Sequence, residues 1–427
     1  MDLMVNPLQP IDRTLSIPGD KSISHRSVML GAIATGITSI DNFLPGQDCW
    51  STVRCVRQLG VEVTELGPDR LQVHGRGLDG LQEPDNYMDV GNSGTTMRLL
   101  AGVLAGQDFL SVLTGDDSIR KRPMARIAEP LRQMGARVWG RGNGRFAPLI
   151  IRGGHLQAIN YLTPVASAQI KSAVLLAGLY GQGVTSVTEP ALSRDHTEKM
   201  LAAFGAKINT DGLTTSIQPG PLTAQQIMVP GDISSAAFFL VAGAIVPGAC
   251  LTVARVGLNP TRTGILDVLR EMGAEVIITN QTQSSGEPMG DITIKGHGLR
   301  GANIGGSLIP RLIDEIPVLA VAAAAAEGAT VIRDASELRV KESNRLQAIA
   351  TELRRFGAHI GETEDGLAIK GGGNYKGAVC ESYNDHRIAM ACALMGLVAS
   401  GPTIVHGAEC IDISFPGFAE TLASLYE

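Results

Sequence analysis

The hydrophobic pattern of the chain repeats, and its most regular phrase occurs five times. The copies are VRQLGVEV ending at Val63, LRQMGARV at Val138, LAAFGAKI at Ile208, LREMGAEV at Val276 and LRRFGAHI at Ile360. Their glycines follow one another at intervals of 75, 70, 68 and 84 residues. Each phrase predicts an amphipathic helix that ends at a C′ glycine in the left-handed conformation and passes directly into a strand.

A second phrase predicts short alternating strands, each closed by glycine. Its copies are LQVHG from residue 71, LIIRG from 149, TSIQPG from 215, ITIKG from 292 and LAIKG from 367. We expect the sixth copy of the repeat to be split, because the chain ends in a helical FAETLASLYE and begins with a strand-like RTLSIPG.

A third phrase, a small or polar cluster leading into an almost wholly apolar helix, occurs six times. The copies start at Gly19 (GDKSISHRSVMLGAIA), Gly91 (GNSGTTMRLLAGVLA), Ala166 (ASAQIKSAVLLAGL), Gly231 (GDISSAAFFLVAGA), Leu312 (LIDEIPVLAVAAAAA) and Asn384 (NDHRIAMACALMGLV). Helices that are apolar on all sides are buried, so their polar starts should emerge at a surface. Capping accounts for part of this polarity. It does not explain basic residues at positive dipole ends, which favour a bound anion; these are Lys21, Arg26, Arg98, Lys171 and Arg387.

The repeats predict an α/β protein of two similar lobes. Units of roughly 70 residues exceed the usual solenoid period of about 20–50 residues, and six of them divide naturally into three per lobe. Pro-Gly-Asp turns at 18–20 and 230–232 are plausible crossings. The first lobe would span 20–230, the second 1–19 plus 231–427, and a small anion should bind in the cleft between them.

Composition narrows the class of protein. Apolar residues make up 44% and charged residues 18%, and the formal net charge is −6, which argues against disorder and against a surface built for nucleic acid. The N-terminus shows no secretory signal, and the longest apolar runs have 11 residues, too short to span a membrane. Six cysteines without a CxxC pair and eight histidines without an HxH or HxxxH pair predict a reduced, cytoplasmic protein without a structural zinc site.

Candidate anion ligands gather at the helix starts. Lys21, Ser22 and Arg26 could all reach a phosphate at the first one, although a surface loop with two bases is the alternative. Ser167 and Gln169, like Ser193-Arg194, are weak evidence alone, since ordinary capping explains them. The string IRKRP at 119–123 concentrates three cations, with a solvated face as the alternative.

Carboxylates occur among these cations. In RVKESNR at 339–345 we expect a helix on which Lys341, Glu342 and Arg345 share a flank, unless this is an ordinary salt-bridged helix. Asp314-Glu315 opens an apolar helix, where acids are also normal caps. Asp314 and Glu342 offer general acid/base groups. His386 is as plausible a structural hydrogen bonder as a catalyst. Walker A, GxSxG and full GxGxxG motifs are absent.

Together the motifs resemble the enolpyruvyl transferases, and within them the EPSP synthase (3-phosphoshikimate 1-carboxyvinyltransferase) family. The matching strings are PGDKSISHR, GNSGTTMR, KRPM, SAQIKSA, PGDISSAAFF, IDEIP, ELRVKESNRL and NDHRIAM, in family order over essentially the whole chain. The resemblance implies an inside-out α/β barrel fold of two lobes, each with three βαβαββ units, that closes around shikimate 3-phosphate and phosphoenolpyruvate.

The resemblance also assigns residues to each substrate. Those facing shikimate 3-phosphate would be Lys21, Ser22, Arg26, Ser167, Ala168, Gln169, Arg194, Asp314 and Lys341. Those facing phosphoenolpyruvate would be Lys21, Gly94, Arg122, Gln169, Arg345 and Arg387. Glu342 is expected to move the carbon-bound proton and Asp314 the hydroxyl proton, with Lys21 assisting. No metal or organic cofactor is expected, the enzyme should be a monomer, and glyphosate should inhibit it.

The chain departs from the family pattern at two places. Ile413 stands where some members carry a lysine, and Arg194 where others have a lysine or a tyrosine-bearing segment, which suggests a divergent subgroup. The same-fold alternative is UDP-N-acetylglucosamine enolpyruvyl transferase, but 116–127 contains no cysteine, unlike the reactive loop of that enzyme. A non-catalytic phosphoanion-binding protein is a further alternative, against which Asp314 and Glu342 weigh.

Overall fold

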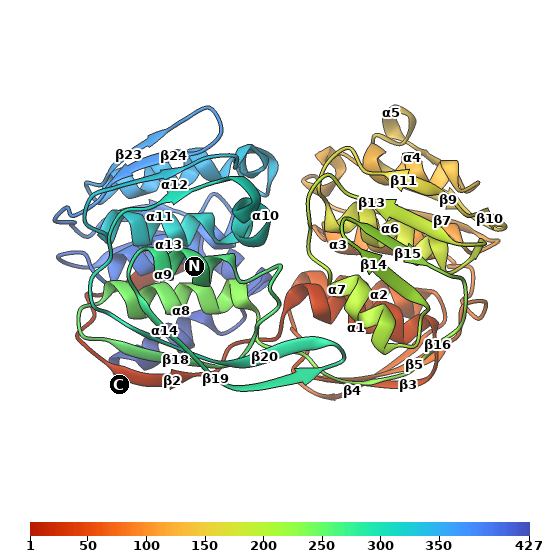
Figure 1. Cartoon of the computed structure of the whole chain (residues 1–427), viewed down its shortest axis with the longest axis horizontal. Helices are drawn as coiled ribbons and strands as arrows, with labels where there is room; N and C mark the ends of the chain where they lie inside the picture. Colours follow the sequence, from red (N-terminus) through yellow and green to blue (C-terminus); the bar gives the residue numbers. More distant parts are fainter. The chain divides into compact units, whose positions relative to one another are not determined.

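Six almost wholly buried helices form the centres of two units into which the chain divides. The computed structural model describes all residues from Met1 to Glu427. Unit 1 comprises Met1–Pro18, Pro230–Thr282 and Pro288–Glu427, and unit 2 comprises Gly19–Val229 and Gln283–Glu287. Unit 2 contains α1 (Lys21–Ile33), α3 (Gly94–Ala105) and α6 (Ala168–Gly178), whereas unit 1 contains α8 (Ile233–Ile245), α11 (Ile316–Ala325) and α13 (His386–Gly396) (Figure 1). All six were predicted as buried helices, and this prediction is confirmed.

Amphipathic helices with left-handed terminal glycines also lie where the first phrase predicts them. They are α2 (Gln47–Gln58), α4 (Ala125–Gln133), α7 (His196–Ala203), α9 (Gly264–Glu271) and α12 (Arg345–Arg355). The glycines that follow them, 60, 135, 205, 273 and 357, have φ values of 81°, 103°, 90°, 97° and 92°. Glycine takes this conformation without the steric cost that a Cβ brings, so each helix ends there and the next strand begins.

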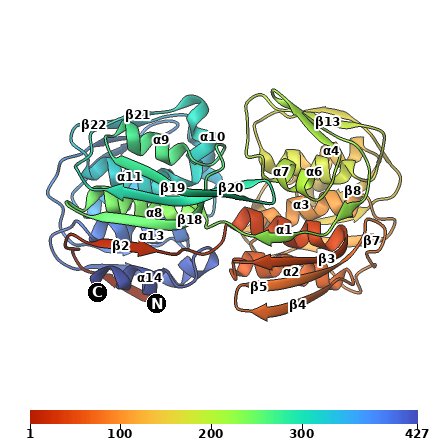
Figure 2. The same ribbon diagram turned by 60° about the horizontal axis from the view of Figure 1, so that its bottom comes forward.

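The three larger sheets of unit 2 share one topology. In each, the first two strands are parallel and the later pairs are antiparallel. The first sheet has the order β16 (Leu222–Thr223), β3 (Ala34–Asp41), β5 (Arg70–Arg76), β4 (Glu62–Gly67), and β17 (Gln226–Met228) also pairs with β3. The second has the order β6 (Met88–Asp89), β7 (Leu110–Thr114), β9 (Phe146–Arg152), β8 (Arg137–Gly140). The third has the order β11 (Asn160–Leu162), β13 (Thr185–Thr188), β15 (Thr214–Ile217), β14 (Ile208–Asp211). A short pair, β10 (Leu156–Gln157) and β12 (Gly181–Gln182), completes the unit. Figure 2 shows β3, β4 and β5 side by side next to α1 and α2.

Unit 1 has three sheets of related order. They are β2 (Asp12–Leu15), β18 (Cys250–Gly257), β20 (Glu287–Lys295), β19 (Glu275–Ser284); β21 (Asn303–Ile304), β22 (Ala329–Ile332), β24 (Leu367–Lys370), β23 (His359–Glu362); and β25 (Val379–Glu381), β26 (Thr403–His406), β1 (Asp2–Val5). Three short helices remain in the chain, α5 (Arg141–Gly144), α10 (Ile309–Leu312) and α14 (Phe418–Ala423). The 3₁₀ turns are 119–121, 306–308, 313–315, 336–340, 408–413 and 424–426.

The prediction for the split sixth repeat is wrong in one respect. The strand of RTLSIPG, β2, pairs in parallel with β18 and so belongs to the sheet of the fourth repeat. The last sheet is completed by β1, which pairs antiparallel with β26 from Asp2 opposite His406 to Val5 opposite Thr403. Pro7 and Pro10 lie between β1 and β2, and since proline breaks a strand ladder, the two strands are separate elements.

A close helix contact fixes the polar ends of α3 and α6. A Cβ added to Gly102, in the middle of α3, would lie 2.3 Å from the backbone oxygen of Ala173 in α6. Only glycine lets the two backbones approach this closely. At the starts of the same helices, Arg98 Nη1 donates to Gln169 Oε1 at 2.5 Å. Backbone packing thus sets the spacing of side chains that belong to the candidate site.

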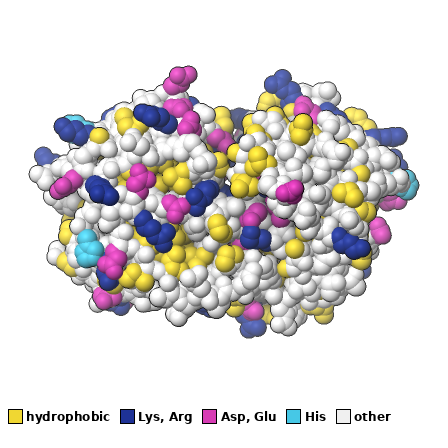
Figure 3. All heavy atoms as spheres, in the orientation of Figure 1, with side chains coloured by type: hydrophobic (Ala, Val, Ile, Leu, Met, Phe, Trp, Pro, Cys, Tyr) yellow, Lys and Arg dark blue, Asp and Glu magenta, His cyan; other side chains and the backbone are white.

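The surface carries charges of both signs. On the face shown in Figure 3, Lys and Arg side chains are interspersed with Asp and Glu, without a face of one sign. None of the helices combines the length and the apolar character needed to cross a membrane.

Two buried histidines near the helix starts are uncharged. His25 in α1 is fully buried, with Nδ1 2.6 Å from Thr52 Oγ1, and His386 begins α13 at 4% exposure. Burial lowers the pKa of each imidazole to about 3, the attraction of nearby Asp48 or Asp385 being too weak to offset it. Neutral His386 therefore cannot act as a cation for an anionic ligand.

These histidines predict a loss of stability in acid. Each imidazole has a pKa of about 6.5 in the unfolded chain and about 3 in the folded chain, so its contribution to the free energy of unfolding is fully present above pH 6.5. Its contribution falls by about 1.4 kcal/mol per pH unit as the pH drops from 6.5 toward 3, because only the unfolded chain takes up the proton. We expect urea midpoints measured across this range to fall steeply, and His25→Gln to flatten the dependence. A profile equally steep in the variant would contradict the assignment.

Candidate functional site

In unit 2, the start of α1 holds Lys21 in a defined place. Asp20 caps the helix, its Oδ1 accepting from the backbone N–H of Ile23 at 2.9 Å. Lys21 Nζ lies 2.5 Å from Asp48 Oδ2, and the two side chains are 24% and 13% exposed. Asp48 belongs to α2, so the ion pair joins the starts of two helices while the lysine side chain stays partly exposed. The sequence contained no signal for this partner.

Arg26 is buried and held by three hydrogen bonds. It is 5% exposed and donates to Thr197 Oγ1 at 2.7 Å, to Ser172 Oγ at 3.1 Å and to the backbone oxygen of Ser22 at 2.9 Å. Burial lowers its pKa to about 10, which leaves it charged at neutral pH. A guanidinium has five N–H donors, so this arrangement retains capacity for a further acceptor. Arg194 lies near enough to act on its pKa as a second positive charge.

Gly94, Arg122 and Gln169 gather around Arg98. A Cβ on Gly94 would lie 3.1 Å from Arg98 Nη1 and 3.5 Å from Arg122 Nη1. Arg122 donates to Asn92 Oδ1 at 2.7 Å, and Gln169 both accepts from Arg98 and donates to Thr95 Oγ1 at 3.3 Å. Two guanidinium groups beside a glycine make a place where an anion can approach the backbone. Arg98 stood out in the sequence only as a cation in a helix start, not as a site residue.

The start of α6 differs from the sequence expectation. Ser167 is the N-cap residue, but its side chain makes no capping hydrogen bond; Ala168 is the first helical residue. Lys171 is not available to an anion, because its Nζ lies 2.6 Å from Glu189 Oε2 and 2.7 Å from Glu198 Oε1 in a buried cluster. The expectation that Lys171 helps to bind an anion is therefore wrong.

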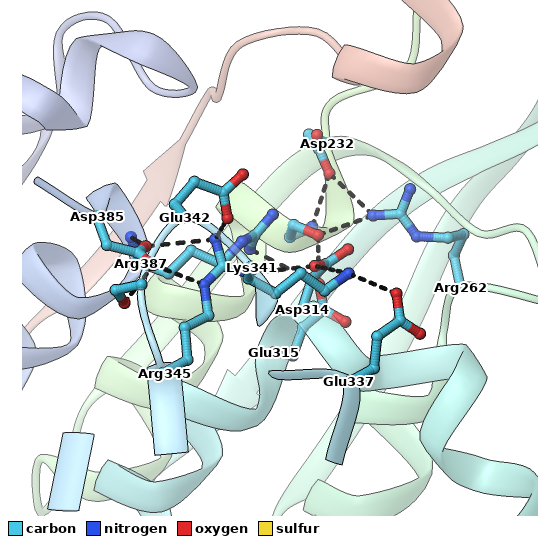
Figure 4. A network of polar contacts seen from close by, with 12 residues as sticks. Asp232, Arg262, Asp314, Glu315, Glu337, Lys341, Glu342, Arg345, Asp385 and Arg387 are labelled. Carbon is cyan, nitrogen blue, oxygen red and sulfur yellow. Dashed lines mark hydrogen bonds and ion pairs between the residues drawn. The ribbon is translucent and has the colours of Figure 1, made fainter. Parts of the chain in front are cut away.

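In unit 1, Arg345 is the centre of a carboxylate network (Figure 4). It is 2% exposed; its Nε lies 2.8 Å from Asp385 Oδ2, its Nη2 2.6 Å from Glu342 Oε2 and its Nη1 3.4 Å from Asp314 Oδ1. Burial by itself would lower the pKa of Arg345, but these three carboxylates outweigh it and raise the pKa well above its ordinary value. Burial acts to raise the pKa of Asp385, but the attraction of Arg345 outweighs burial, so the pKa lies below its ordinary value.

The two candidate acid/base groups lie at the accessible side of this network. The side chains of Asp314 and Glu342 are 15% and 28% exposed, whereas Asp385 is buried. Lys341 Nζ is 3.9 Å from Asp314 Oδ1 and 3.2 Å from Glu337 Oε1. A carboxylate that touches both a cation and solvent can exchange protons with a ligand, which a fully enclosed one cannot.

The helix expected to carry Lys341, Glu342 and Arg345 on one flank starts later than predicted. Residues 336–340 form a 3₁₀ turn and α12 begins at Arg345, because Asn344 caps it by accepting from the N–H of Gln347 at 3.3 Å. Lys341 and Glu342 precede the helix in a loop. The ion pair of Glu342 with Arg345 forms nevertheless.

Further polar residues stand behind this network. Arg387 Nη1 lies 4.0 Å from Glu315 Oε1, and Glu315, which is fully buried, also accepts from Ser234. Arg262 donates to Ser234 Oγ at 2.8 Å. Asp232 caps α8 as Asp20 caps α1, so the two PGD turns have the same role in their units. In the sequence, Glu315 and Arg387 stood out as charged residues at helix starts and Asp232 through its PGD turn, whereas Arg262 carried no signal.

One cluster of potential metal ligands lies elsewhere in unit 1. Ligand atoms of Glu352, Cys380 and Cys392, all buried, lie within 4.8 Å of one another. The Glu352 carboxylate already accepts from the Tyr383 hydroxyl at 2.7 Å and from the N–H of Glu381 at 3.0 Å, and it pairs with Arg355. These partners account for its burial without an ion.

Comparisons with known proteins agree over the length of the chain. A family model described as EPSP synthase (3-phosphoshikimate 1-carboxyvinyltransferase) matches residues 5–422. The 3-phosphoshikimate 1-carboxyvinyltransferase of Pelotomaculum thermopropionicum is 58% identical over 429 residues, covering 100% of this chain and 99% of the relative. That of Desulforamulus reducens is 56% identical over 423 residues, covering 99% of each.

Solved structures agree as well. The structure of EPSP synthase from Acinetobacter baumannii superposes with a TM-score of 0.91 at 46% identity, covering 100% of this chain and 98% of that one. The mixed α/β fold predicted from the sequence is thereby confirmed, and so is the resemblance in the motifs. The chain belongs to the EPSP synthase (3-phosphoshikimate 1-carboxyvinyltransferase) family.

Proposed function

We propose that the residues gathered in the two units together transfer the carboxyvinyl group of phosphoenolpyruvate to the 5-hydroxyl of shikimate 3-phosphate. The products are 5-enolpyruvylshikimate 3-phosphate and inorganic phosphate, in the shikimate pathway to chorismate and the aromatic amino acids. The observation that carries the proposal is the full-length match to this family, combined with the clustering of the expected residues at helix starts.

Unit 2 is proposed to supply most of the charge for binding the substrates. Arg26, with unused N–H groups, suits the phosphate of shikimate 3-phosphate. Ser22, Ser167, Ala168, Gln169 and Arg194 complete this binding set. Arg122 and Gly94 suit phosphoenolpyruvate, since two guanidinium groups lie within 3.5 Å of the space next to Gly94. Lys21 serves both substrates.

Unit 1 is proposed to supply the proton transfers. Glu342 protonates C3 of phosphoenolpyruvate, and the 5-hydroxyl attacks the cationic C2 while Asp314, assisted by Lys21, accepts the hydroxyl proton. The tetrahedral intermediate then expels phosphate as a methyl proton returns to Glu342. Arg345 and Arg387 bind phosphoenolpyruvate, and Lys341 binds shikimate 3-phosphate. An anion bound at Arg345 would compete with Glu342 for the guanidinium, which lies 2.6 Å from Glu342 Oε2.

The finer architecture is part of the proposal. Three sheets of one order in unit 2 and three of related order in unit 1 support two lobes of three βαβαββ units, an inside-out α/β barrel in each. We also propose that the enzyme is a monomer and that it acts in the cytoplasm; the six cysteines form no disulfide, which suits a reducing compartment.

Inorganic phosphate release separates this function from its alternatives. With phosphoenolpyruvate present, release should require shikimate 3-phosphate and should not occur with UDP-N-acetylglucosamine. Binding of both anions without release would instead identify a non-catalytic phosphoanion-binding protein. No metal or organic cofactor takes part in the proposed steps.

Replacing Glu342 tests the assignment of the carbon acid. Glu342→Gln keeps a polar side chain near Arg345 but cannot donate or accept the proton, so turnover should fall by roughly 10²-fold or more. The dissociation constant for shikimate 3-phosphate should stay nearly unchanged. The matched control is Glu337→Gln, because Glu337 is 55% exposed and pairs with Lys341 instead; it should turn over almost normally. Near wild-type turnover in Glu342→Gln would refute the assignment.

Gly94→Ala tests the site of phosphoenolpyruvate and of the inhibitor glyphosate, which we expect to compete with it. The added methyl would lie 3.1 Å from Arg98 Nη1, so the Arg98 guanidinium must give way slightly, whereas Arg122 Nη1 at 3.5 Å remains in ordinary contact. A methyl in a packed site costs about 1–3 kcal/mol, which predicts about a tenfold or larger rise in the inhibition constant. Phosphoenolpyruvate, whose phosphorus and carboxylate are separated by one bond fewer than in glyphosate, should lose less affinity. Gly220→Ala, where a Cβ meets nothing within 4 Å, is the control. Indifference of the unmodified enzyme to millimolar glyphosate would exclude Gly94 as the determinant.

A further inference from the structure

Unit 2 buries three charged side chains that the proposed reaction does not use. Lys171 of α6 lies between Glu189, which follows β13, and Glu198 of α7, at 2.6 and 2.7 Å. The three side chains are 4%, 2% and 8% exposed. Three elements distant in the sequence are thus joined through one ammonium group.

The cluster is connected to the start of α6. The second carboxylate oxygen of Glu189, Oε1, accepts from the backbone N–H of Ser167 at 3.1 Å. Ser167 is the N-cap residue and makes no side-chain cap of its own. Glu189 therefore supplies from outside the helix the bond that orients Ser167 and the two residues that follow it.

The cluster is also connected to Arg26. Ser172 and Thr197 adjoin Lys171 and Glu198 in sequence, and their hydroxyl groups are hydrogen-bonded to each other at 2.6 Å. Both hydroxyls also accept hydrogen bonds from the Arg26 guanidinium. Glu198 is close enough to oppose the fall in the pKa of Arg26. Polar contacts thus run from the Ser167 N–H through Glu189 and Lys171 to Glu198, and Thr197, the chain neighbour of Glu198, accepts from Arg26.

Stability alone does not account for this arrangement. Apart from Gln169 and Ser172, the rest of α6 is apolar, and Ile170, Val174, Leu175 and Leu176 are buried, so the charged cluster borders an apolar core. Replacing a buried ion cluster by packed apolar residues is often neutral or stabilising. The charges instead fix relative positions, because each salt bridge holds one segment of the chain in place against another.

We propose that Lys171, Glu189 and Glu198 are positioning residues that hold the start of α6 and Arg26 in the geometry required by shikimate 3-phosphate. The inference rests on the proposed function, in which Ser167, Gln169 and Arg26 bind that substrate. Glu189 has the most direct part, since it contacts the backbone of Ser167. None of the three touches the reacting atoms.

The test measures the dissociation constant of shikimate 3-phosphate from the full chain by titration calorimetry, in the absence of phosphoenolpyruvate. The midpoint of thermal unfolding is measured for each variant as well. Glu189→Ala removes the acceptor of the Ser167 N–H, and its dissociation constant should rise about tenfold or more. Glu189→Gln retains an acceptor oxygen, and its dissociation constant should stay within about threefold of the wild-type value. The Michaelis constant for phosphoenolpyruvate should change less in both.

A matched control separates positioning from destabilisation. Leu104→Ala makes a cavity at the far end of α3, where Leu104 is fully buried, and should lower the thermal midpoint without weakening binding. Wild-type affinity in folded Glu189→Ala, or equal weakening in Leu104→Ala, would overturn the inference. If the wild-type chain itself fails to bind shikimate 3-phosphate, or Arg26→Ala binds it normally, the proposed function fails first.

Discussion

A helix that is apolar on every side can place polar chemistry only at its ends, and this constraint organises the molecule. The six central helices are buried along their length, so the residues that precede and open them are the ones left for ligands. Their N-terminal N–H groups and dipoles favour anions there. The close approach at Gly102 shows how packing sets the result, because it brings the ends of α3 and α6 near enough for Arg98 to bond Gln169.

The opposite problem is the cost of keeping cations at these ends without an anion. Carboxylates that lie next to these cations offset this cost. Asp48 and Asp385 are largely enclosed and hold Lys21 and Arg345 in place. Asp314 and Glu342 share Arg345 and are 15% and 28% exposed, so each has a neighbouring cation as well as access to a ligand. Asp48, at 13% exposure, is nearly as accessible as Asp314, so exposure separates only the fully buried Asp385 from the carboxylates proposed for proton transfer.

Local sequence signals predicted the parts of the fold that local physics determines. The glycine at 205 could be read as a helix end because its left-handed conformation excludes most other residues, and α13 could be read as buried because no face of it is polar. Strand partners were not predictable in this way: β1 and β2 have similar patterns, and only long-range pairing with β26 or β18 distinguishes them. The partners of Lys171 were hidden for the same reason, since Glu189 and Glu198 come from other elements.

The start of α12 shows why a misplaced helix boundary matters for chemistry. Had the helix begun at 339, Glu342 would be fixed by helical geometry on the same rigid element as Arg345. Because Asn344 caps the helix, Glu342 lies in the loop before it, while Arg345 is fixed within it by Asp385. A carboxylate with its own backbone freedom can leave a guanidinium that stays in place. That difference suits a group which must pair with Arg345 in the free enzyme and reach a substrate carbon in the complex.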